Sequence, residues 1–117
     1  MNFEEMPEFI KDFKKLGKKY RSLPEDMKQF RKIVLKFPLG SKKHFNVLKS
    51  LDGLSIVKAR LSCQYLKGSS LRIVYAYCET KGKIEFIEIY SKSDKQREDR
   101  KRLRSYISQC SRLSATG

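Results

Sequence analysis

The sequence predicts a single α+β domain, in which a small antiparallel β-sheet of three or four strands carries an N-terminal helical hairpin on one face and a C-terminal helix. The sheet is predicted from residues 71–77 and 84–94, which are rich in β-branched and aromatic side chains and are separated by a short glycine-containing segment typical of a β-hairpin. The helical hairpin is predicted from residues 9–20 and 23–37, where apolar side chains recur at helical spacing.

The composition limits the class of protein. A chain of 117 residues buries one core, and 39% hydrophobic residues, including seven Phe and six Tyr, are enough to fill it. Lys and Arg number 27 against 13 Asp and Glu, so the formal net charge is +14. A small domain needs a net charge of only about 2–8 for solubility. We therefore expect a polyanionic partner such as nucleic acid, or an acidic protein, rather than a merely solubilising surface.

Nothing in the sequence predicts a membrane segment or a metal site. Residues 1–7 are acidic and lack an apolar signal region, and no run of 18 apolar residues occurs, so we expect a soluble, cytoplasmic protein. Cys63, Cys78 and Cys110 have no C-x-x-C spacing and His44 is the single histidine, so neither a metal nor another cofactor is expected.

The two N-terminal helices are defined by their apolar stripes and their ends. The first stripe consists of Phe9, Ile10, Phe13, Leu16 and Tyr20, opposite a basic face. A membrane-surface helix is the alternative, but this stripe is ordinary core material, so packing on the sheet is favoured. Ser22-Leu23-Pro24-Glu25 predicts a capping box for the second helix, and Pro38 ends it after Phe37.

The remaining elements follow from alternation and charge. Residues 39–46 are expected to form a loop. Residues 56–61 are expected to form a strand, because apolar and polar side chains alternate there. Its core face is expected to carry Val57, Ala59, Leu61 and Cys63, and its other face Ile56, Lys58, Arg60 and Ser62. Ser93-Asp94-Lys95-Gln96 predicts a capping box that opens a last helix to about Ile107. The domain is expected to span residues 1–107, and residues 108–117 to fray.

A family resemblance is carried by the predicted hairpin. Lys67-Gly68-Ser69-Ser70-Leu71-Arg72, continued by Ile73-Val74-Tyr75, and the strand end Ile89-Tyr90-Ser91-Lys92 resemble the RelE/ParE superfamily of toxins from bacterial and archaeal toxin–antitoxin pairs. In that family a Lys and a Gly/Ser turn precede an Arg-Val/Ile-Val/Ile-Tyr strand, and the next strand ends in Ile-Tyr-x-Lys. The resemblance spans residues 9–107 and implies the order (β)ααβββα, with a further strand near Phe3 where the sequence signal is weak.

The resemblance implies a ribosome-dependent mRNA endoribonuclease that inhibits translation and is neutralised by a cognate antitoxin. RNA cleavage by the internal 2′-hydroxyl needs removal of the 2′ proton, stabilisation of phosphate charge and protonation of the leaving 5′ oxygen. With one histidine present, these tasks fall to Lys, Arg or Tyr in a metal-independent enzyme. The predicted catalytic residues are Lys58, Arg60, Arg72 and Lys92.

These four cations are expected on neighbouring strands. A lysine among other cations loses its proton more readily, which favours a general-base role, whereas arginine clamps phosphate through two hydrogen bonds. The alternative is that Lys58, Arg60 and Arg72 are simply solvated on the open side of a half-covered sheet. Glu88 is expected to pair with Lys92 or another cation.

The predicted RNA-binding residues are Tyr90, Lys67, Lys95 and Arg97. Tyr90 is suited to stacking on a base or donating to a phosphate, although packing in the sheet is an equal alternative. The resemblance also implies a functional residue in or near the last helix, and the candidates are Asp94, Lys95, Arg97, Arg100 and Tyr106. The residue that protonates the leaving group stays open among them.

Two other functions stay open. The ParE branch of the superfamily implies a non-nucleolytic inhibitor of DNA gyrase, but that branch typically lacks the Lys/Arg cluster. A non-catalytic RNA-binding module would require the basic face alone. In the leading interpretation the partners are mRNA, ribosomal RNA in the ribosome, and an acidic antitoxin that covers the cationic face or displaces the last helix, with no membrane partner.

Overall fold

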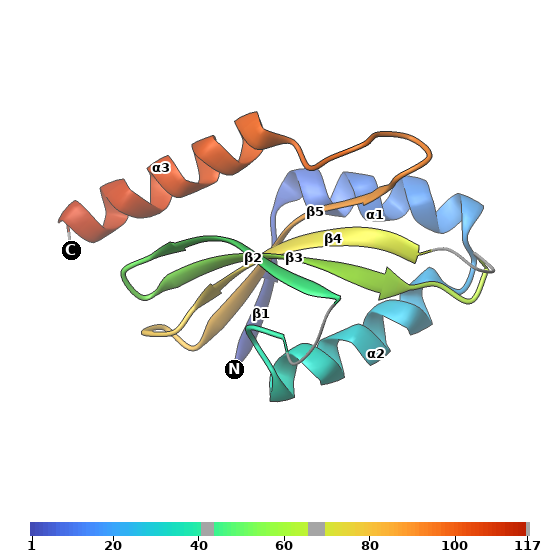
Figure 1. The fold of residues 1–117 in the computed structure, drawn as a ribbon, viewed down its shortest axis with the longest axis horizontal. Helices are drawn as coiled ribbons and strands as arrows, with labels where there is room; N and C mark the ends of the chain where they lie inside the picture. The colour runs from blue at the N-terminus through green and yellow to red at the C-terminus, as the bar shows by residue number, and fades with distance from the viewer. Residues whose placement is uncertain (41–43, 66–69, 117) are drawn as a thin grey trace.

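The structure, a computed structural model, describes residues 1–40, 44–65 and 70–116. Its elements are β1 (Asn2–Glu5), α1 (Pro7–Lys19), α2 (Leu23–Lys36), β2 (Phe45–Leu51), β3 (Leu54–Ser62), β4 (Ser70–Cys78), β5 (Lys83–Ser91) and α3 (Arg100–Thr116). Figure 1 shows a long connection from β5 to α3. The helix α3 then runs back along the sheet. No helix in the described ranges combines the length and apolar character needed to cross a bilayer.

The α+β class is confirmed, but the predicted antiparallel sheet of three or four strands is wrong. The described residues form a five-stranded sheet in the order β1-β5-β4-β3-β2. β1 runs parallel to β5, whereas the other neighbouring strands are antiparallel, so the sheet is mixed. The weakly predicted strand near Phe3 is therefore present, as β1.

The strand that sequence analysis missed is β2, which begins inside the expected loop 39–46. It lies at the edge of the sheet, and its side chains are mostly exposed, so it lacks the alternating apolar pattern of a half-buried strand. Asp52-Gly53 joins it to β3, and Gly53 adopts a φ of 74°, which glycine reaches without steric cost. This Asp-Gly pair was the available hairpin signal.

The face of the sheet toward α1 and α2, here called the hairpin face, holds the larger core. The predicted core side of β3 is confirmed, because Val57, Ala59, Leu61 and Cys63 are all buried there. Tyr75 is fully buried beside Phe86, at a ring distance of 6.2 Å, and donates a hydrogen bond to the Pro38 carbonyl at 2.6 Å. The two predicted N-terminal helices thus cover one face, as expected.

The predicted capping box at Ser22 is wrong. Ser22 precedes α2 but its side chain caps no backbone N–H of that helix. Its hydroxyl instead donates to Asp26 at 2.6 Å, and Asp26 also accepts from the Gln64 backbone N–H at 3.3 Å. Ser22 and Asp26 therefore connect the start of α2 to the segment after β3.

The opposite face, here called the α3 face, holds a second core. A β-bulge decides which β5 residues share it: Val74 pairs with Glu88 but Tyr75 pairs with Phe86, so Ile87 is the extra residue. Because of this extra residue, Ile87, Glu88 and Tyr90 all lie on the α3 face. Phe86 and Ile89 both remain in the hairpin-face core.

The last helix begins later and ends later than predicted. α3 starts at Arg100 rather than Ser93 and is helical to Thr116 rather than Ile107. Residues 92–99, here called the β5–α3 linker, separate it from β5. The cap is Asp99, whose Oδ1 accepts from the Arg102 N–H at 3.0 Å, while the Ser93 segment forms a turn closed on the Ser91 carbonyl.

Asp99→Ala tests this cap. We expect a loss of about 1 kcal/mol in the free energy of unfolding, the usual cost of removing an N-cap side chain. The control is Asp94→Ala, an exposed acidic residue of the same linker, which should change stability by less than about 0.5 kcal/mol. Urea unfolding of both variants is the measurement, and equal effects would contradict the cap assignment.

Candidate functional site

Three side chains form a row across the α3 face. Arg60 on β3 lies directly opposite Arg72 on β4, and Arg72 lies opposite Tyr90 on β5. Lys58 lies on the same face of β3, two residues before Arg60. Directly opposed residues on one face have Cβ atoms about 4.5–5.5 Å apart. The sheet therefore brings Lys58, Arg60, Arg72 and Tyr90 together, and we call these four residues the cationic site.

The two arginines lie next to one another near the end of β3 and the start of β4. Arg60 is exposed and Arg72 is half-buried. Burial lowers the pKa of Arg72, and the neighbouring charge of Arg60 lowers it further. Like charges on facing strand positions repel each other, so an anion bound at this row would relieve that repulsion.

Lys58 has an anionic neighbour that the sequence did not suggest. Its Nζ donates to Glu98 Oε1 at 2.9 Å, and the Glu98 side chain is only 9% exposed. Burial alone would raise the pKa of Glu98, but the Lys58 hydrogen bond and charge outweigh it and hold that pKa below the usual value. Lys58 therefore has a carboxylate partner in addition to the neighbouring cations that the sequence predicted.

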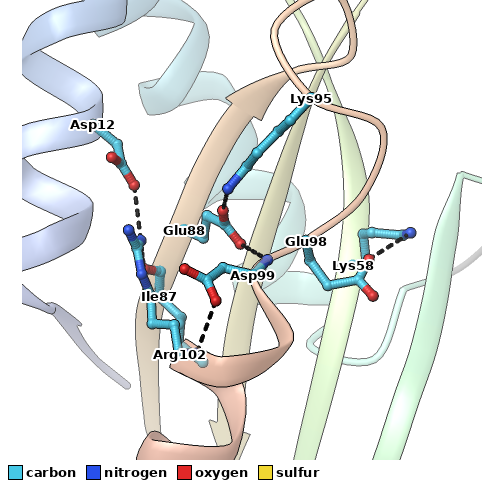
Figure 2. A network of polar contacts seen from close by, with 8 residues as sticks. All are labelled: Asp12, Lys58, Ile87, Glu88, Lys95, Glu98, Asp99 and Arg102. Atoms are coloured by element: carbon cyan, nitrogen blue, oxygen red, sulfur yellow. Dashed lines mark hydrogen bonds and ion pairs between the residues drawn. The ribbon is translucent and has the colours of Figure 1, made fainter.

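Glu88 attaches the linker to the sheet (Figure 2). Its carboxylate is 1% exposed and accepts hydrogen bonds from Lys95 Nζ and, at 2.8 Å, from the Asp99 backbone N–H. Arg102 adds a second attachment, since Nη1 lies 2.8 Å from Asp12 on α1 and 3.0 Å from the carbonyl of the bulge residue Ile87. The cation that pairs with Glu88 is thus Lys95 rather than Lys92.

Tyr90 is packed rather than open. It is 4% exposed within the α3-face core, and Lys95 Nζ lies 5.1 Å from the ring centroid. This arrangement leaves no room for a base to stack on the ring. Its hydroxyl is buried without a hydrogen-bond partner in the described part of the chain. Burial, aided by Glu98 and Glu88, raises the pKa of Tyr90 to about 12, so the phenol keeps its proton near neutral pH as an unused donor.

The other predicted residues lie apart from the cationic site or outside the described residues. β5 ends at Ser91, so Lys92 lies on an exposed turn and its predicted strand position is wrong. Arg97 is exposed in the linker, and Lys67 falls outside the described residues. Tyr106 is committed elsewhere, because it donates to Glu85 at 2.9 Å. Asp94 and Arg100 are exposed, in the linker and at the start of α3.

Sequence analysis missed Glu98, and the signal was weak. Glu98 and Asp99 are the two acidic residues within the strongly basic stretch 95–104. Two carboxylates in such a run are equally compatible with ion pairs to nearby cations of the same helix and with an ion pair to a strand that is distant in sequence. Its position on Lys58 follows only from the route of the linker.

A separate cavity of about 600 Å³ opens at the other end of the strands. Its wall includes Cys78, Glu85, Tyr106 and Cys110. The Leu54–Cys78 pair lies six register positions from the Arg60–Arg72 pair, which is about 20 Å along a strand. The cavity is therefore distinct from the cationic site. Among the described residues, no group of three or more His, Cys, Asp or Glu is arranged to hold a metal ion.

Comparisons of the chain with protein-family models, curated proteins and solved structures found no match. The resemblance to RelE/ParE toxins thus stays a prediction from the residues themselves.

Removing the Glu88 carboxylate should detach the linker. Glu88→Ala leaves the Asp99 N–H and the Lys95 ammonium without their buried acceptor, so we expect a loss of about 2 kcal/mol in unfolding free energy. Trypsin should then cut faster after Lys95 and Arg97, as mapped by mass spectrometry. Glu79→Ala, in the exposed β4–β5 turn, is the control and should change neither quantity.

The Lys58–Glu98 pair should make stability depend on pH on the acid side. Because the folded pKa of Glu98 is lower than its ordinary value of 4.5, its contribution is complete above that value and disappears as pH falls through the folded pKa. Thermal unfolding between about pH 6 and pH 3 should therefore show a stability difference between wild type and Glu98→Gln that shrinks as pH falls. A difference that stays constant would contradict the pair. The pKa of Asp99 is also lowered, but Asp99 is present in both proteins, so its contribution to the pH dependence cancels in the comparison.

Proposed function

We propose that the protein is the toxin of a toxin–antitoxin pair, a RelE-like endoribonuclease that cuts mRNA in the ribosome, inhibits translation in the cytoplasm and uses no metal ion. The observation that carries this proposal is the row of Arg60, Arg72 and Tyr90 with Lys58 beside it. Such a group of donors on a β-sheet suits a phosphate that gains negative charge in the transition state. The net charge of +14 supports a large polyanion as the binding surface.

The roles follow from the chemistry of each side chain. The guanidinium groups of Arg60 and Arg72 hold the non-bridging oxygens of the scissile phosphate. The Tyr90 hydroxyl is a protonated donor that is buried in this structure, and it adds a hydrogen bond to the same group only once the side chains that cover it move. Lys58 lies on the same face beside Arg60, and its ammonium is placed to donate a proton to the leaving 5′ oxygen.

A strongly basic toxin needs an acidic antitoxin. The partner that best matches a charge of +14 is an acidic protein segment laid over Arg60 and Arg72, and its association would be fast and salt-sensitive. Such a cover keeps the phosphate site closed until the partner is removed.

Arg72→Lys and Arg72→Ala test the phosphate site. We expect both to lower the single-turnover rate of mRNA cleavage on programmed ribosomes by roughly 100-fold or more, since a point charge does not reproduce a planar fork. Arg60→Ala should also reduce cleavage and growth inhibition while changing unfolding free energy by less than about 0.5 kcal/mol, because Arg60 is exposed.

The matched control is Lys14→Ala, which removes an exposed cation from α1 and should leave cleavage unchanged. If the Arg72→Lys variant cleaves mRNA at the wild-type rate, Arg72 does not bind the phosphate through two hydrogen bonds. Loss of plasmid supercoiling with intact mRNA would favour gyrase inhibition instead, and RNA binding without any cleavage would favour a plain binding module.

A further inference from the structure

We propose that Glu98 is an internal anion that occupies the Lys58 end of the phosphate site, so that RNA must displace this side chain before Lys58 can contact a phosphate. The inference depends on the proposed function to the extent that the cationic site binds RNA. It adds a built-in competitor on the same chain, located in the β5–α3 linker.

The geometry of the pair is that of a bound oxyanion. Glu98 presents a carboxylate oxygen 2.9 Å from Lys58 Nζ, a typical distance for a charge-assisted hydrogen bond from lysine to a carboxylate or phosphate. The lysine side chain is 25% exposed and the glutamate side chain 9% exposed. The carboxylate thus occupies a hydrogen-bonding position on Lys58 Nζ that a phosphate oxygen would otherwise take.

The Glu98 carboxylate supplies a hydrogen-bond acceptor to only one residue of the cationic site, Lys58. Tyr90 has a buried hydroxyl without a hydrogen-bond partner in the described residues, and Arg60 remains exposed. A single carboxylate is therefore an incomplete substitute for a larger anion at the same place. A phosphate with several oxygens has enough acceptors for Lys58, Tyr90 and the arginines together.

The rest of the linker can stay in place when Glu98 leaves. Glu88 holds the neighbouring Asp99 backbone N–H at 2.8 Å and also binds Lys95, and neither contact involves Glu98 (Figure 2). Asp99 continues to cap α3 through Arg102. Opening of the site therefore requires rotation of one side chain, not displacement of the last helix.

Binding to an uncleavable RNA tests the inference separately from catalysis. The probe is a fluorescent single-stranded 2′-O-methyl RNA oligonucleotide, whose blocked 2′ oxygen prevents cleavage, and the readout is anisotropy. Glu98→Gln should tighten binding about tenfold, as expected when one competing charge-assisted hydrogen bond is lost.

Glu79→Gln is the matched control, because it makes the same change of charge in the exposed β4–β5 turn far from Lys58. It should leave affinity within about twofold of wild type. If Glu98→Gln is poorly folded by circular dichroism, Glu98→Asp replaces it. That variant keeps the charge but retracts the carboxylate, so its affinity should rise by about threefold.

The outcomes separate the inference from the proposed function. Tighter binding by Glu98→Gln without any ribosomal cleavage by wild type supports the internal competitor and contradicts the nuclease. Equal effects of Glu98→Gln and Glu79→Gln, or weaker binding by Glu98→Gln, overturn the competitor even if wild type cleaves mRNA. Absence of RNA binding by wild type and Glu98→Gln alike overturns both.

Discussion

The arrangement of the α3 face depends on one buried carboxylate, that of Glu88. The bulge at Ile87 turns Glu88 onto this face, where it is 1% exposed and must find donors. Its oxygens accept hydrogen bonds from the Asp99 backbone N–H and the Lys95 ammonium, and these bonds hold the linker against β5. That position sets where α3 begins and brings Glu98 onto Lys58.

The α3 face has two parts, an apolar part that packs against α3 and a cationic part that contains Arg60. Near the β2–β3 and β4–β5 turns, α3 covers apolar residues such as Ile56 and Ala76. Toward the other end of β3, beyond this core, Arg60 is exposed. α3 thus completes the core without covering Arg60, and Glu98 of the linker between β5 and α3 binds Lys58. This division lets one short sheet support both a folded core and the proposed anion site.

Most of the fold followed from local patterns. The helices α1 and α2, the β4–β5 hairpin and the two faces of β3 were predicted because each buries an apolar stripe or alternation of its own. β2 was missed because an exposed edge strand lacks that alternation. The start of α3 was placed too early because Ser93 has the composition of a cap, whereas the cap that forms is Asp99, held in place by Glu88.

The sequence by itself determined that Lys58 and Arg60 share a face and that the protein is strongly basic, since strand alternation and composition are local properties. Only the tertiary structure decided what these cations meet. Strand register set Arg72 between Arg60 and Tyr90, and the linker delivered Glu98 to Lys58 across forty positions of sequence. A contact between residues so far apart depends on how the whole chain packs, and no local spacing encodes it.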